Sequence, residues 1–304
     1  MNLILFHPLS IYCAWAVSTG LGDVFQRMGH NVSVFPINAT VDTIDKKMYP
    51  SAKQLREADG IVVSGPEHLN RHILALYPEW TSISTPKVAW MHETVERLDD
   101  DQASVNAIHR FVQKTFTSAI QDTKYGMRWM PFGVDTEVFK PNGGQPKLFD
   151  VAFIGYLYPK RAAFLETVRP HLGDIKILCG NVQVRDLAGV KVRETAALYA
   201  DNLRSIKVFV NFPSMSELAV TKVTEAQACG TFLITPILRH QQNYEGIQAH
   251  FYDPERPESL AESIRFCLER DQEREEAARI CCEQVHRLHK LENRCEILLQ
   301  ALNN

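Results

Sequence analysis

The sequence predicts an α/β protein with two domains, each built on a parallel sheet covered by helices. One observation is that short apolar, β-branched runs alternate with helix-like stretches along most of the chain. Another is a single turn-rich stretch, PNGGQP, which divides this alternation into two series. The length of 304 residues is enough for two separate cores.

The first series occupies residues 1–138 and opens on LILFHP, which has the pattern of a buried strand. A helical stretch follows from Ser18 to His30, with Gly29 near its end. Apolar runs bounded by turn residues then predict more strands, and two weaker candidates close the series. The runs are VSVFP, GIVVSG and KVAWMH, and the weaker candidates are TFTSA and RWMPF.

The second series follows a linker over residues 139–149 and covers residues 150–285. Its predicted strands are DVAFIG, IKILCG, SIKVFVNF, TFLIT and HFYDP. From Pro257 onward the pattern is helical only and densely charged. The closing segment from Glu283 to Asn304 is expected to be a helix with one apolar stripe. The stripe consists of Leu288, Leu291, Cys295, Leu298, Leu299 and Leu302.

Composition indicates an ordinary globular protein, with 45% hydrophobic and 23% charged residues. The net charge of −3 shows no overall attraction to nucleic acid or anionic membranes. We expect no transmembrane segment, because no apolar run approaches the required length. The start, MNLILFHPLS, lacks the features of a signal peptide. The seven cysteines form no CxxC pair, which favours reduced thiols in a cytoplasmic protein and argues against a zinc site.

The most informative feature is the pair Glu217 and Glu225 within SELAVTKVTEAQACG. A predicted strand precedes it, and the helix that carries it is expected to end at Gly230. Phosphates bind at such strand-to-helix crossings, while carboxylates there suit ribose and sugar hydroxyls. Lys222 lies one helical turn before Glu225 and can face phosphates.

This segment resembles the donor-binding motif of GT-B glycosyltransferases, closest to the spore-coat-maturation-like branch. The resemblance implies two Rossmann-like domains facing across a cleft. It also implies that Glu225 binds the nucleotide ribose, that Glu217 lies near the donor sugar as a catalytic residue, and that Thr221 contributes to donor binding. Lys222 stands where an Arg is more usual. Two solvated glutamates on an amphipathic helix are the alternative interpretation.

Two further stretches are similar to GT-B motifs. Pro131-Phe132-Gly133-Val134-Asp135 with Phe139-Lys140-Pro141 resembles the signature that ends the N-terminal domain. Phe153 to Arg161 resembles the loop after the first strand of the C-terminal domain. There Gly155 would let the backbone come close to the ligand, and Lys160 or Arg161 would hold the diphosphate. Arg161 has the better geometry, because its planar guanidinium can bind two phosphate oxygens at once. Alternatively, Lys160 and Arg161 are solvated residues at a helix start.

Acceptor specificity belongs to the N-domain in GT-B enzymes, and residues 1–114 match only by pattern. Ser18, Thr19 and Gly20 open a predicted helix and are candidates for the acceptor side. His92 and Glu93 follow a predicted strand, at the edge where ligands meet open α/β sheets. Related enzymes have a His at this place, so His92 is a catalytic candidate and Glu93 an acceptor contact. A capped helix and a structural histidine are the alternatives.

The expected activity is transfer from a nucleotide-diphosphate sugar to an acceptor hydroxyl, retaining by resemblance, with no cofactor. The acceptor is open: a glycan, a small molecule or, less favoured, a modified DNA base. We expect no metal, because Asp99-Asp100-Asp101 has no strand before it and is interpreted as a solvated run or helix cap. The alternatives are a nucleotide-sugar epimerase or hydrolase, or a catalytically silent nucleotide-binding module. The oligomeric state stays open.

The GT-B resemblance also predicts that the helix at 286–304 packs back on the N-domain. Chains of this fold often end in this way. The closing helix would then use its apolar stripe against a surface of the first series.

Overall fold

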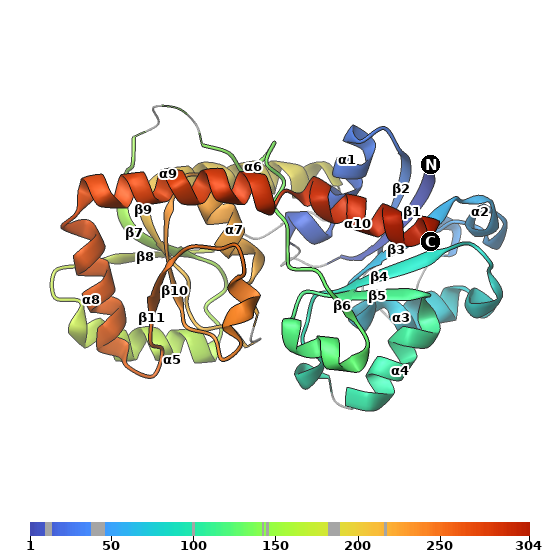
Figure 1. Cartoon of the computed structure of the whole chain (residues 1–304), viewed down its shortest axis with the longest axis horizontal. Coiled ribbons are helices and arrows are strands. Elements are labelled where there is room, and N and C mark those ends of the chain that lie inside the picture. The colour runs from blue at the N-terminus through green and yellow to red at the C-terminus, as the bar shows by residue number, and fades with distance from the viewer. Residues whose placement is uncertain are drawn as a thin grey trace. The chain divides into compact units, whose positions relative to one another are not determined.

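The computed structural model describes residues 1–9, 14–37, 46–98, 101–141, 143, 146–181, 189–215 and 218–304. They form two compact α/β units (Figure 1). The first unit consists of Met1–Gly133, Val184–Arg193 and Leu291–Asn304, and the second of Val134–Gln183 and Glu194–Lys290. The sequence-based domain limits, with a linker at 139–149, stay predictions.

The sheet of the first unit has the order β2-β1-β3-β4-β5-β6, and every neighbouring pair is parallel. Each strand-like run of the first series forms a strand, although RWMPF contributes only two residues. β3 and β4 are buried along their whole length, as expected for a parallel sheet covered on both faces. The strands are β1 (Asn2–Pro8), β2 (Asn31–Ile37), β3 (Gly60–Ser64), β4 (Lys87–Met91), β5 (Lys114–Thr117) and β6 (Arg128–Trp129).

Helices cover both faces of this sheet. α1 (Thr19–Arg27) and α10 (Leu291–Asn303) pack together on one face, and α3 (Pro66–Leu76) and α4 (Asp101–Phe111) lie on the other (Figure 1). The short α2 (Ala52–Glu57) begins with a capping box between Ser51 and Gln54. The main core joins Phe6, Val63 and Ala89 of the sheet to α3.

The second unit repeats the scheme with a parallel sheet in the order β11-β10-β9-β7-β8. α5 and α8 pack on one face, and α7 and α9 on the other (Figure 1). Every strand predicted in the second series is present. The strands are β7 (Phe149–Ile154), β8 (Ile177–Gly180), β9 (Ile206–Val210), β10 (Phe232–Pro236) and β11 (His250–Tyr252). The helices are α5 (Pro159–Val168), α6 (Gly189–Arg204), α7 (Thr221–Ala228), α8 (Pro257–Leu268) and α9 (Asp271–Leu288).

The closing segment differs from the expected single helix. α9 ends at Leu288 and α10 begins at Leu291. The break follows from backbone pairing: His289 O accepts the Val134 N–H at 2.8 Å, and Val134 forms a parallel bridge with Lys290. Leu288 is therefore 40% exposed, whereas the rest of the predicted stripe is buried on α10. α10 belongs to the first unit.

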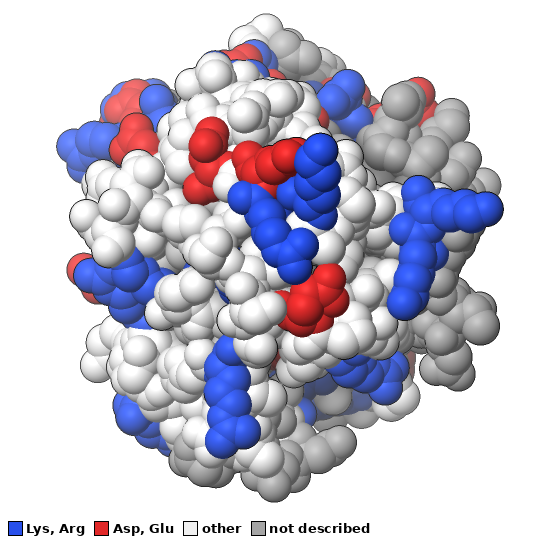
Figure 2. Space-filling view, turned by 90° about the vertical axis from the view of Figure 1, so that its right-hand side faces the viewer, with Lys and Arg blue, Asp and Glu red and all other residues white. Residues whose placement is uncertain are grey.

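On the face shown in Figure 2, Lys and Arg side chains lie scattered, with Asp and Glu between some of them. Within the described part of the chain, no helix is both long enough and apolar enough to cross a membrane. Asp101 begins α4, while Asp99 and Asp100 lie outside the described residues.

Candidate functional site

The predicted donor residues gather at the carboxyl edge of the second sheet. Gly155 directly follows β7, and α5 and α7 begin at the same edge because they follow β7 and β9. Open α/β sheets bind ligands at this edge. Arg161 is in the first turn of α5, and Lys222 and Glu225 are on α7. The fold thus brings together two motifs separated by about sixty residues of sequence.

Lys222 lies across the end of β7. Its Nζ donates to Ile154 O at 3.3 Å and lies 5.0 Å from the centroid of the Phe153 ring. A Cβ at position 155 would overlap the Lys222 ammonium and approach Phe153 to 2.9 Å. Glycine at 155 therefore makes room for the lysine.

Arg161 points inward and is 6% exposed, whereas its neighbour Lys160 is exposed. Arg161 Nε donates to Pro213 O at 3.2 Å, and its Nη1 donates to Tyr156 O at 3.2 Å. Its guanidinium lies 4.7 Å from the centroid of the Tyr158 ring. The sequence left two candidates for a diphosphate contact, and this geometry favours Arg161.

Glu225 and Lys222 lie close enough for each to shift the pKa of the other. Glu225 is 3% exposed, and burial raises its pKa to about 7, although Lys222 and a hydrogen bond from the Thr221 side chain oppose the rise. Burial, assisted by Arg161, lowers the pKa of Lys222 to about 7, against the effect of Glu225. Two basic groups and one carboxyl group in this small volume suit a ligand with both phosphates and hydroxyls.

The start of α7 adds a further polar feature. The helix begins at Thr221, and its N-cap is Val220, whose side chain cannot accept a hydrogen bond. The first N–H groups of α7 therefore have no side-chain cap, which is the arrangement that binds anions. The predicted catalytic Glu217 and its neighbour Ser216 lie outside the described residues.

In the first unit, His92 follows β4 at the carboxyl edge. Its Nε2 lies 3.2 Å from Ser64 Oγ, which donates its own proton to Val17 O at 2.8 Å. The ring must therefore donate from Nε2, so Nδ1 is the acceptor nitrogen. Burial lowers the pKa of His92 to about 3, with smaller contributions from His68 and His7. His92 is thus a neutral imidazole across the physiological range.

The other predicted acceptor-side residues have structural partners. Glu93 forms an ion pair with Arg97 one turn further along. Ser18 is fully buried and donates to Trp15 O at 3.3 Å, while Thr19 is half-buried. A Cβ on Gly20 would lie 2.6 Å from Trp15 Cε2, so packing of the indole accounts for this small residue. Their roles toward an acceptor stay predictions.

Sequence reasoning missed Glu67, whose carboxyl oxygen accepts two backbone N–H bonds from the segment that carries His92. The available signal was Gly65-Pro66-Glu67 directly after the strand GIVVSG. A glutamate in the first turn of a helix at a strand's carboxyl end lies where ligands bind. Which backbone groups it reaches depends on the neighbouring strand.

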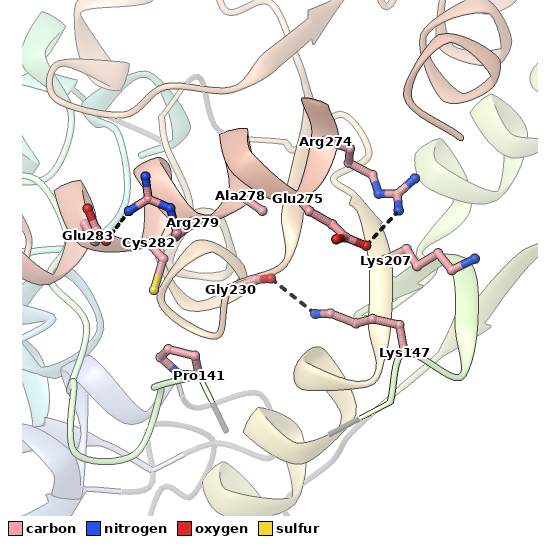
Figure 3. Close-up of a pocket in the computed structure, with 10 residues that line it drawn as sticks. All are labelled: Pro141, Lys147, Lys207, Gly230, Arg274, Glu275, Ala278, Arg279, Cys282 and Glu283. Carbon is pink, nitrogen blue, oxygen red and sulfur yellow. Dashed lines mark hydrogen bonds and ion pairs between the residues drawn. The ribbon is translucent and has the colours of Figure 1, made fainter. Parts of the chain in front are cut away.

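A separate pocket of about 350 Å³ opens at the opposite edge of the second sheet (Figure 3). Lys147 precedes β7 and Gly230 precedes β10, which places the pocket at the amino ends of the strands. Lys147 donates to Gly230 O at 3.2 Å, and Arg279 pairs with Glu283 at 2.6 Å. This pocket is therefore distinct from the candidate donor site.

Comparisons with known proteins also indicate a glycosyltransferase. Residues 160–300, just under half of the chain, match the family model described as "Glycosyl transferase-like". No curated protein matches. Among solved structures, HepE from Anabaena, in complex with UDP-glucose, is similar with a TM-score of 0.68 and 13% identity over 100% of this chain and 99% of that chain.

Two other solved structures are also similar. Sucrose-phosphate synthase from Thermosynechococcus elongatus has a TM-score of 0.67 and 13% identity over 99% of each chain. An α-glucosyltransferase in complex with UDP and a 13-mer DNA has a TM-score of 0.66 and 12% identity over 100% of each chain. The chain has the GT-B glycosyltransferase fold. Together with the family match, this confirms the resemblance, the fold class and the enzyme class predicted from the sequence.

Proposed function

We propose that this GT-B glycosyltransferase moves a sugar from a nucleotide-diphosphate sugar to an acceptor hydroxyl, with retention at the anomeric carbon and without a divalent metal. The observation that carries the proposal is the grouping of Arg161, Lys222 and Glu225 around Gly155 at one sheet edge. UDP-sugars are the first donors to test, because HepE was solved with UDP and with UDP-glucose.

The proposed donor contacts follow from charge. Arg161, Lys222 and the start of α7 take the diphosphate, while Glu225 accepts hydrogen bonds from ribose hydroxyls. Bound phosphates favour the protonated form of Lys222, whose pKa is about 7 in the protein alone. Each charge-assisted contact contributes about 1.5–3 kcal/mol.

During transfer, the bond between the anomeric carbon and the diphosphate oxygen breaks, and a bond to the acceptor oxygen forms. Negative charge develops on the leaving diphosphate, and an oxygen of that diphosphate takes up the proton that the acceptor hydroxyl gives up. Fixed positive groups aimed at that charge stabilise the transition state. Arg161 and Lys222 fill this role in the proposed mechanism, which is why no metal is invoked.

His92 is proposed as a neutral polar contact rather than a general acid. With Nε2–H directed at Ser64, its Nδ1 can accept a hydrogen bond from a substrate hydroxyl. A pKa of about 3 leaves it uncharged at the pH of transfer. The proposed role of Glu217 near the donor sugar rests on the family motif.

The proposal is tested by incubating the protein with a panel of nucleotide sugars while following nucleotide diphosphate release and thermal stability together. Transfer predicts stabilisation by the donor and release that increases when the right acceptor is added. Release that no acceptor increases would indicate a hydrolase, and an epimerised sugar without release an epimerase. Stabilisation without any turnover would indicate a silent nucleotide-binding module.

A further inference from the structure

Glu67 is buried beneath the end of β4 in the first unit. Its side chain is 0% exposed. One oxygen, Oε1, accepts the backbone N–H of His92 at 2.9 Å and that of Glu93 at 3.1 Å. The other oxygen, Oε2, is buried without a hydrogen-bond partner among the described residues.

Local sequence explains why this carboxyl group reaches β4. Gly65, in the left-handed conformation with φ 70°, turns the chain after β3, and Pro66 starts α3. Glu67 therefore lies in the first helical turn, next to the strand that pairs with β3. β3 and β4 are neighbours, with Ser64 opposite Trp90, so the side chain reaches the first two residues beyond β4.

We propose that Glu67 is a positioning residue for His92. Two hydrogen bonds from one oxygen fix the backbone at His92 and Glu93. The His92 ring is then fixed at its other end by Ser64, which is anchored on Val17 O. Glu67 does not contact substrate itself, because its oxygens are enclosed. The inference rests on the function proposed for His92.

The segment after β4 that carries His92 also donates a hydrogen bond to a second buried acid, which offers a matched comparison with Glu67. Asp122 is also fully buried, and its Oδ2 accepts the N–H of Val95 at 2.9 Å. Burial raises the pKa of both acids, to about 8 for Glu67 and about 6 for Asp122. Asp122 thus holds the loop three residues beyond His92 by the same kind of bond. Removing it should cost stability without moving the imidazole.

The experiment compares kcat, the donor KM and thermal stability in Glu67→Ala, Glu67→Gln and Asp122→Ala. We expect Glu67→Ala to lower kcat by up to about a hundredfold, because misplacement of a reacting group costs this much. Glu67→Gln keeps the accepting oxygen and should restore most of the rate. Asp122→Ala should lose stability similarly but keep kcat. If Glu67→Ala does not fold, Glu67→Met removes both oxygens while filling the volume.

A second readout does not depend on activity. Imidazole nitrogen NMR, assigned with His92→Gln, should show the Nε2–H form of His92 in the wild type and a mixed population in Glu67→Ala. An unchanged His92 signal, or equal kcat losses in Glu67→Ala and Asp122→Ala, would overturn the positioning role. If the signal changes but His92→Gln transfers normally, Glu67 still positions the ring and only the function proposed for His92 fails.

Discussion

Arg161 and Lys160 are adjacent in sequence, yet only Arg161 is enclosed by the loop after β7 and the segment after β9. Two backbone carbonyls orient its guanidinium, at Tyr156 and Pro213. The motif located the pair and guanidinium chemistry favoured Arg161, but which of the two is enclosed depends on the side of α5 that faces the sheet edge. The two neighbours therefore form a matched test.

We expect Arg161→Ala to weaken nucleoside diphosphate binding by about 10- to 150-fold, the equivalent of about 1.5–3 kcal/mol for a charge-assisted contact. The bare nucleoside should bind Arg161→Ala almost as it binds the wild type. Lys160→Ala is the control, because that side chain is exposed. Titration calorimetry with both ligands decides the question. Equal losses for nucleoside and diphosphate would show that Arg161 is not a phosphate contact.

The lowered pKa of Lys222 predicts that binding of a nucleoside diphosphate depends on pH. The Lys222 pKa of about 7 in the protein alone must rise when phosphates bind, so binding takes up a proton above pH 7. Affinity for a nucleoside diphosphate should therefore fall between pH 7 and 9, by at most about tenfold per pH unit. Lys222→Arg should flatten this slope, because guanidinium stays charged. Equal slopes in the two proteins would contradict the assignment.

At the scale of elements, the strands were predictable because parallel strands buried on both faces are continuous apolar runs. The break between α9 and α10 was not predictable. It depends on His289 O accepting the N–H of Val134, which is remote in sequence. Glu67 was missed for the same reason, since its partners are on the neighbouring strand. Local patterns give the elements, whereas contacts between distant segments require the fold.

The α10 helix gives a stability prediction. Leu298 is fully buried in the first unit, whereas the adjacent Ile297 is 37% exposed. Leu298→Ala should lower the free energy of unfolding by about 2–5 kcal/mol through loss of apolar burial and the cavity left behind. Ile297→Ala is the control on the same helix and should change it much less. Urea unfolding measures both, and comparable effects would show that α10 does not pack as described.

At the scale of the whole molecule, the residues predicted for the donor side come together in the fold, whereas those predicted for the acceptor side have structural partners. Gly155, Arg161, Lys222 and Glu225 belong to short motifs at fixed spacing, and the fold brings them together. Ser18 and Gly20, by contrast, are explained by contacts with Trp15. An acceptor site depends on side chains from several loops, so no short motif could identify the acceptor.

Metal independence is a prediction for the whole enzyme. Positive groups at the donor edge should replace a divalent ion, so turnover should persist in excess chelator. Asp99→Asn/Asp101→Asn should also remain active. Loss of turnover in chelator, recovery with manganese and an inactive double variant would together assign the acidic triplet to the active site.

The cluster of Arg161, Lys222 and Glu225 is proposed to bind a nucleotide-diphosphate sugar for transfer. The most direct measurement is titration of UDP-glucose and related donors into the wild type and Glu225→Ala, followed by nucleotide diphosphate release with acceptors. Saturable binding and acceptor-dependent release by the wild type, with both lost in a folded Glu225→Ala protein, is the predicted result. Equal donor binding by the two proteins would contradict the claim.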